Sequence, residues 1–295
     1  IGWDDVLEDA KKAHIPVILV NNGVDTDDSS LYSCMLGSDY GKQMKKAGKW
    51  LDEYLKEEEE KKAEKEKAAS EAPTQEESEQ TDSEDTEVNT DSSKATDSSA
   101  SIFDKIMKSS STAKDEADLT EEEQTEEDIT IKIAAIQESI GSEEQLMRAQ
   151  GYQTMLERYS DWEMVAQQTG DNSREEAEKV MKLFLEQEPD LRVVFAESDE
   201  MALGAIDAIG KSGKTCGEDG DIIVISFGGS KAGIEAVKEG KLNVTFECNP
   251  GQGPKAAELI QRLESDISID KEQYVEETYF DGTMDLDEII ENRTY

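Results

Sequence analysis

The feature that most constrains the fold is an alternation of short apolar runs with amphipathic stretches along most of the chain. Residues 16–20 (PVILV) form a continuous apolar run that ends at the turn sequence NNG, as a strand buried on both faces would. Amphipathic stretches such as 40–55 follow these runs, with Met44 and Ala47 on one face. Regular alternation of strand and helix is typical of βαβ units. The sequence therefore predicts an α/β fold with parallel sheets and flanking helices.

Seven strands and seven helices are predicted from this pattern. The strands span residues 16–20, 31–37, 129–136, 162–167, 192–196, 221–227 and 242–247. The helices span residues 4–13, 40–55, 143–158, 173–187, 201–212, 231–239 and 254–264.

An acidic, low-complexity insertion interrupts the alternation at residues 57–128, where 26 acidic residues stand against 8 lysines. Its first part, residues 57–67 (EEEEKKAEKEK), pairs Glu with Lys four residues later and should extend the preceding helix. Residues 70–128 are predicted to be disordered, because they contain too few apolar side chains to offset the entropy of ordering. Residues 102–108 could form a transient turn or, around Phe103, a partner-docking motif. The insertion joins a helix to the start of a strand, so we expect it to leave from the face opposite a ligand cleft.

The overall charge excludes several functions. The chain has 71 Asp and Glu against 31 Lys and Arg, a net charge of −40. Such a chain would repel phosphates, which argues against a general nucleic-acid binder, and it offers no basic patch for anionic lipid. No run of 18 or more apolar residues is present to span a membrane.

Metal and nucleophile chemistry find little support. The three cysteines, Cys34, Cys216 and Cys248, lack CxxC spacing, and His14 is the only histidine. We therefore expect no disulfide framework, no metal site, no cofactor and no catalysis. A pair of carboxylates acting as in a glycosidase, Asp171 with Asp199, is the remaining enzymatic alternative.

Candidate ligand-binding residues come from the position of the strands. Ligands of parallel sheets bind at the carboxyl ends of the strands, and the residues that follow the predicted strands are small and polar. Asn can both donate and accept hydrogen bonds, as sugar hydroxyls require. The candidates are Asn21, Asn22, Gln137, Glu138, Asp171, Asn172, Ser198, Asp199, Gly228, Cys248 and Asn249. The alternative is that they are ordinary loop and helix-capping residues.

Five stretches carry a resemblance to a known family. They are residues 3–25 (WDDVLEDAKKAHIPVILVNNGVD), 161–170 (DWEMVAQQTG), 197–206 (ESDEMALGAI), 243–250 (NVTFECNP) and 291–295 (ENRTY). In this order and spacing the chain resembles the type I periplasmic sugar-binding proteins of ABC transporters, in their ribose/galactofuranose-binding branch. The resemblance implies two α/β lobes joined by three crossovers, with a sugar clamped between them.

The same resemblance implies an incomplete N-lobe. Family members have roughly 100 further residues, about one half-lobe, before the helix that starts near Trp3. Residues 1–38 and 249–275 would form the partial N-lobe, and residues 39–248 and 276–295 the C-lobe. We therefore interpret the chain as a fragment.

Several site positions depart from the family pattern. Asn21-Asn22 stands where ribose-type members have an Asp-Arg pair, and Asn172 replaces a stacking aromatic residue. Gly228 replaces an Asp that commonly accepts hydrogen bonds from two sugar hydroxyls. Because charged acceptors are stronger than neutral ones, these changes leave the sugar open.

The function implied by the resemblance is that of the solute-binding component of an ABC sugar importer. It would bind a monosaccharide, furanose or pyranose, and present it to a membrane permease, as a monomeric and lipid-anchored protein in the periplasm or at the cell surface. The alternative is the effector-binding domain of a LacI-type transcription regulator, which shares the fold. A regulator would need a basic helix-turn-helix head, and this acidic chain shows none.

Overall fold

The computed structural model describes residues 2–70 and 130–295. Within these residues, 2–65 and 130–295 form one compact unit, which contains the whole of both sheets. The disorder expected at residues 70–128 stays a prediction, because residues 71–128 lie outside the described residues.

The larger sheet has six strands in the order β4-β3-β5-β6-β7-β9. All neighbours in it are parallel except β7 and β9, which are antiparallel. Its strands are β3 (Ile131–Gln137), β4 (Trp162–Thr169), β5 (Val193–Ala196), β6 (Ile223–Gly228), β7 (Val244–Glu247) and β9 (Tyr279–Asp281).

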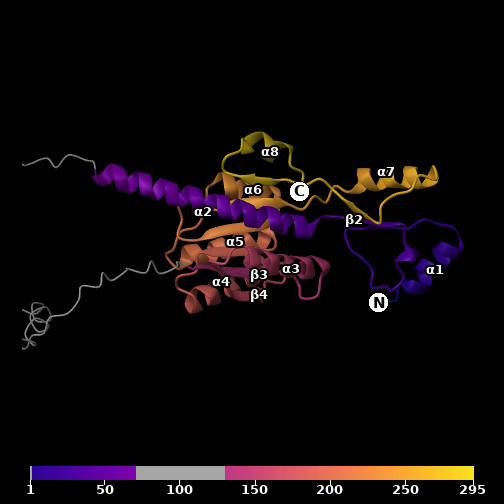
Figure 1. Ribbon diagram of the computed structural model, residues 1–295, viewed down its shortest axis with the longest axis horizontal. Coiled ribbons are helices and arrows are strands. Elements are labelled where there is room, and N and C mark those ends of the chain that lie inside the picture. The colour runs from indigo at the N-terminus through magenta and orange to yellow at the C-terminus, as the bar shows by residue number, and fades with distance from the viewer. Residues whose placement is uncertain (1, 71–129) are drawn as a thin grey trace, which may run out of the picture. The chain divides into compact units, whose positions relative to one another are not determined.

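Helices cover both faces of this sheet (Figure 1). Alternate residues of β3 point to opposite faces, so Ala134 and Ile136 join one core and Ile133 and Ala135 the other. The first core is closed by α4 (Arg174–Gln187), α5 (Asp199–Lys211), α6 (Lys231–Lys238) and α8 (Leu286–Asn292). The second core is closed by α2 (Tyr40–Ser70) and α3 (Glu143–Arg158).

Serine side chains cap four of the helices that follow strands, α3, α4, α5 and α6. The hydroxyls of Ser142, Ser173, Ser198 and Ser230 each accept a hydrogen bond from the amide three residues later. Each cap satisfies a backbone amide that the helix itself cannot pair. The caps fix where each chain segment turns from a strand end into a helix.

The smaller sheet has three parallel strands, β1 (Ile18–Val20), β2 (Cys34–Gly37) and β8 (Glu272–Tyr274), in the order β1-β2-β8. Its buried core is small and consists of Cys34 and Leu36 with Leu259 of α7 (Gly253–Glu264). The helix α1 (Asp4–Lys12) precedes β1, and a short 3₁₀ helix (Ser29–Leu31) precedes β2.

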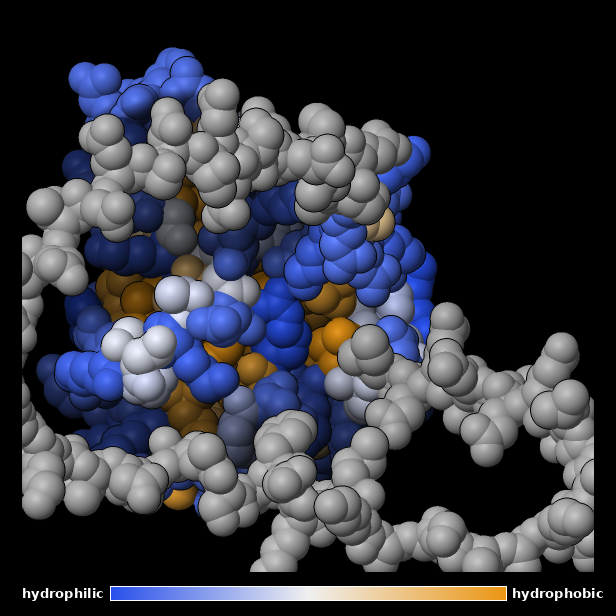
Figure 2. Space-filling view, turned by 90° about the vertical axis from the view of Figure 1, so that its left-hand side faces the viewer, coloured by the Kyte–Doolittle hydropathy of each residue, from blue (hydrophilic) through white to orange (hydrophobic). Residues whose placement is uncertain are grey.

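The expected α/β class with parallel sheets and flanking helices is confirmed. The helix 143–158 was predicted with its observed bounds, and the acidic stretch 57–67 does extend α2. Figure 2 faces the side from which this extension emerges and shows hydrophilic residues with hydrophobic ones visible between them. Strand β2 begins at Cys34 rather than at residue 31, because residues 29–31 form the 3₁₀ helix. Within the described residues, no helix is both long and apolar enough to cross a membrane.

Candidate functional site

A cavity of about 260 Å³ lies where the carboxyl ends of strands from both sheets meet. The residues that follow β1, β2, β3, β5 and β7 contribute to it, as does Gly228 at the end of β6. The cavity is lined by Asn21, Ser38, Tyr40, Glu138, Glu144, Arg148, Glu197, Ser198, Phe227, Gly228, Cys248, Asn249 and Pro250. This is the edge at which parallel sheets bind their ligands.

Six of the eleven predicted residues line this cavity, namely Asn21, Glu138, Ser198, Gly228, Cys248 and Asn249. Ser198 also caps α5, so the capping alternative and the binding role apply to the same side chain. Their binding of a ligand stays a prediction.

The other five do not line the cavity. Asn22 follows Asn21, which has a positive φ of 69°. Gln137 is buried and donates to Gln167 at 3.2 Å. Asp171 and Asn172 form an exposed turn after β4, which is the outermost strand of the sheet.

Asp199, the fifth, is a buried acceptor inside the fold. Its Oδ1 accepts hydrogen bonds from Ser226 Oγ at 2.6 Å and Thr245 Oγ1 at 2.7 Å. Its Oδ2 accepts from the Ser230 amide at 2.7 Å. Asp199 thus ties α5 to β6, β7 and the start of α6. The glycosidase alternative, which needs this carboxylate free, gains no support.

Gly228 is required by this packing. Its φ is +151°, and a Cβ atom there would lie 2.6 Å from Asp199 Oδ2. Real Cβ atoms do not approach a neighbour so closely. The buried carboxylate of Asp199 therefore accounts for glycine at position 228, where the resembling family commonly has an Asp.

Arg148 is the main cavity residue that sequence reasoning missed. It lies on α3, is only 2% exposed, and places its guanidinium 4.6 Å from the centre of the Phe227 ring and 5.0 Å from that of Tyr40. Its Nη1 donates to the Glu197 carbonyl at 3.2 Å, whereas its Nε has no hydrogen-bond partner among the described residues. A buried cation with a free donor is costly unless a ligand completes it. The spacing Glu144, Arg148, Tyr152, one residue per helical turn, was the available signal.

Carboxyl groups surround this guanidinium. The Glu138 amide donates to Glu197 Oε2 at 2.9 Å, and Tyr40 Oη donates to Glu144 Oε1 at 3.0 Å. Burial raises the pKa of Glu197 to about 7, although Arg148 opposes the shift, and burial likewise raises the pKa of Glu138. The cavity wall thus offers several acceptors and one strong, buried donor.

The Cys248 thiol completes the wall beside Arg148. Its Sγ lies 3.5 Å from Arg148 Nη2, and burial raises its pKa to about 11. The thiol is therefore neutral at ordinary pH. Within residues 2–70 and 130–295, no group of three or more His, Cys, Asp and Glu side chains is placed to hold a metal ion.

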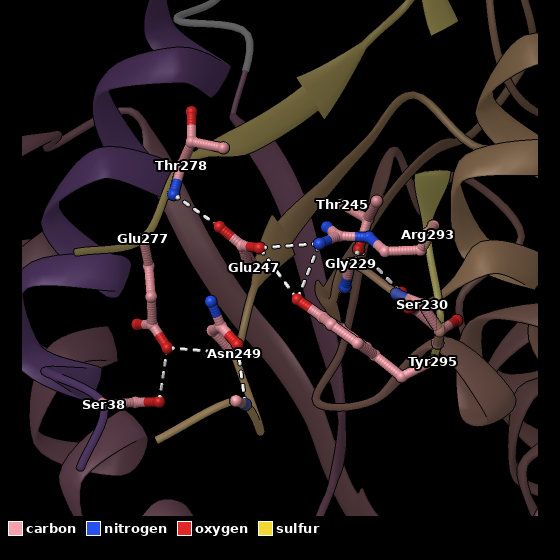
Figure 3. A network of polar contacts seen from close by, with 12 residues as sticks. Ser38, Gly229, Ser230, Thr245, Glu247, Asn249, Glu277, Thr278, Arg293 and Tyr295 are labelled. Atoms are coloured by element: carbon pink, nitrogen blue, oxygen red, sulfur yellow. Dashed lines mark hydrogen bonds and ion pairs between the residues drawn. The ribbon is translucent and has the colours of Figure 1, made fainter. Parts of the chain in front are cut away.

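Two C-terminal residues, Arg293 and Tyr295, bind the carboxylate of Glu247 at the end of β7 (Figure 3). Glu247 Oε1 accepts hydrogen bonds from Arg293 Nη1 and Tyr295 Oη, both at 2.8 Å, and Glu247 Oε2 accepts from the Thr278 amide at 3.2 Å. Burial alone would raise the pKa of Glu247, but these hydrogen bonds hold it below its usual value. The ending ENRTY is thus tied to Glu247 at the end of β7.

The chain matches a known protein family. A family described as the periplasmic binding protein domain matches residues 2–266. The chain is 34% identical over 133 residues to the ribose import binding protein of Salmonella typhimurium. The matched region is 45% of this chain and 43% of that protein. It is 22% identical over 268 residues to the galactofuranose-binding protein of Escherichia coli. That matched region is 90% of this chain and 61% of that protein. The chain thus spans less than two thirds of these relatives.

Solved structures share the fold. A crystal structure from Mycobacterium smegmatis has a TM-score of 0.68 at 24% identity, and the match covers 99% of this chain and 74% of that one. Another from the same organism, in complex with β-D-fucofuranose, has a TM-score of 0.66 at 25% identity and covers 99% and 72%. The binding protein of the arabinose ABC transporter from Shewanella, bound to L-arabinofuranose, has a TM-score of 0.67 at 22% identity and covers 100% and 77%.

Proposed function

The chain belongs to the periplasmic binding protein family, and from this premise we propose that it is the solute-binding component of an ABC sugar importer. The family binds solutes and is non-enzymatic, which agrees with the expectation that the chain is not an enzyme. The observation that carries the proposal is the cavity at the strand ends, with Arg148 buried in its wall and one guanidinium donor unused.

We propose a neutral monosaccharide as the ligand. The cavity wall holds three carboxyl groups, Glu138, Glu144 and Glu197, against the single guanidinium of Arg148. With three carboxyl groups beside one guanidinium, the cavity wall has no excess of positive charge to balance an anionic ligand. Hydroxyl groups can donate to the carboxylates and accept from Arg148 and Asn249. Furanoses bound to two of the similar structures support this class.

We also propose that the two sheets belong to two lobes. Strands β1, β2 and β8 come from residues 1–38 and 249–275, the proposed partial N-lobe, and the six strands of the larger sheet come from the proposed C-lobe. A ligand in the cavity would touch both, since Asn21 and Ser38 follow strands of one sheet and Glu138 and Ser198 follow strands of the other.

The proposed setting follows from the family. A periplasmic binding protein works outside the cytoplasm and delivers its ligand to a permease, here proposed to be a sugar permease. We extend this to a lipid anchor that would hold the protein at a membrane surface. Mass spectrometry of the protein from its source cells tests the anchor.

The binding proposal is tested by thermal unfolding with a panel of sugars. The panel contains D-ribose, L-arabinose, D-galactose, D-fucose, D-allose and myo-inositol. At 100 times its Kd, a ligand stabilises the folded state by about 2.7 kcal/mol, which gives a clear rise in Tm. Arg148→Met should remove the rise, whereas Arg158→Met, on the exposed side of the same helix, should keep it. No rise with any sugar would contradict the proposal.

A further inference from the structure

The chain passes three times between the two sheets. A carboxylate in one of these connections contacts the other two. The connections are residues 38–39 after β2, 248–252 after β7, and 275–278 between β8 and β9. Glu277, in the third connection, reaches the other two (Figure 3).

The carboxylate of Glu277 is used on both oxygens. Its Oε1 accepts hydrogen bonds from Ser38 Oγ at 2.6 Å and from the Asn249 amide at 2.8 Å. Its Oε2 accepts from Gln43 Nε2 at 2.8 Å. All three partners are donors, so they match an ionised carboxylate, whose hydrogen bonds are about twice as strong as neutral ones. Lys46 Nζ binds the carbonyl of Glu277 at 2.7 Å and so holds its backbone as well.

The partners of Glu277 are cavity residues or hold cavity residues. Ser38 and Asn249 line the cavity, whereas Glu277 does not. Gln43 is 3% exposed, and its Nε2 also donates to the Glu247 carbonyl at 2.8 Å and lies 3.4 Å from Cys248 Sγ. Glu277 thus fixes the cavity wall from outside.

We propose that Glu277 is a positioning residue for ligand binding, which holds Ser38, Asn249 and, through Gln43, Cys248 in the arrangement that the ligand meets. This inference rests on the proposed function. The side chain of Glu277 would thus align the three connections between the sheets.

The substitution Glu277→Gln tests the role with little change in size. The Glu277 carboxylate accepts hydrogen bonds from three donors on its two oxygens. A glutamine side chain has only one acceptor oxygen, and its NH₂ group cannot accept a hydrogen bond from the donor it would face. At least one of the three contacts must break. Glu276→Gln is the matched control, because it makes the same change in charge on the exposed neighbouring residue.

Two readouts are needed, calorimetric titration with the tightest-binding sugar of the panel and amide hydrogen exchange without sugar. For Glu277→Gln we expect an affinity loss on the order of tenfold, corresponding to one lost charged contact. We also expect faster exchange at the Asn249 amide, with strand amides of the larger sheet unchanged. Ser38→Ala should cost less affinity in the Glu277→Gln background than in the wild type, because the two side chains act through one contact.

The outcomes separate the two proposals. If the wild type binds a sugar and Glu277→Gln binds it equally well, the role of Glu277 is refuted and the proposed function stands. If exchange accelerates throughout the protein, Glu277 acts on stability rather than on position, and the inference is likewise refuted. If the wild type binds no sugar of the panel, the proposed function fails and the role of Glu277 fails with it.

Discussion

Glu197 should make the stability of the folded protein depend on pH, and replacing it with glutamine should remove this dependence. The side chain is 1% exposed, and burial raises its pKa from a usual 4.5 to about 7 against the pull of Arg148 and the Glu138 amide. Between these two values the folded protein holds a proton that the unfolded chain has released. The contribution to stability is therefore fully present below pH 4.5 and is lost as the pH rises to about 7.

The size of the effect follows from the two pKa values. The interval from 4.5 to about 7 corresponds to ~3 kcal/mol of unfolding free energy, at about 1.4 kcal/mol per pH unit. Urea unfolding of the wild type and Glu197→Gln at pH 4.5, 6 and 8 measures it. The free-energy difference between the two proteins should shift by ~3 kcal/mol in favour of the glutamine variant across this range.

The reference variant is Glu157→Gln, on the exposed side of α3, which should keep the pH dependence of the wild type. A difference between wild type and Glu197→Gln that stays constant from pH 4.5 to 8 would refute the reasoning. Glu197 would then be ionised in the folded protein already at low pH, and its burial would be offset by contacts other than those described.

Three further predictions concern the cavity and its surroundings. Gly228→Ala should lower the unfolding free energy by about 2–3 kcal/mol, because its methyl group meets Asp199, whereas Gly210→Ala, whose methyl meets nothing, should be neutral or stabilising in the same denaturation assay. Cys248, with its pKa raised to about 11, should react with a thiol reagent at pH 8 far more slowly than in urea, and equal rates by mass spectrometry would show that the thiol is not buried. Deleting residues 71–127 should leave the affinity for sugar within twofold of the wild type in calorimetry, because the tract enters β3 at its amino end; a tenfold loss would place it at the cavity.

Sequence patterns predicted the elements that are long or continuously apolar. The strands β3, β5 and β6 are largely apolar runs between two helical layers, and α3 carries an amphipathic pattern with a serine cap. The strands β8 (EQY) and β9 (YFD) were missed because neither is a continuous apolar run, unlike the equally short β1 (ILV). Their pairing comes from neighbouring strands and not from their own sequence.

The rule that ligands bind at the ends of strands predicted part of the candidate site. Asn21, Glu138 and Asn249 follow strands that end at the cavity. Asp171 also follows a strand, but β4 is the edge of the sheet, and strand order cannot be read from one sequence. Arg148 was missed because it reaches the cavity from a helix, so the rule about strand ends does not cover it.

The most direct test of the central claim, a sugar held at the strand ends, is amide hydrogen exchange with and without the tightest-binding sugar of the panel. Sugar should slow exchange at residues 138–139, 198–199 and 248–249. The exposed turn at Asp171 and Asn172 should exchange as before. Protection at that turn, or along α2 around Trp50, with none at the three strand ends would contradict this claim.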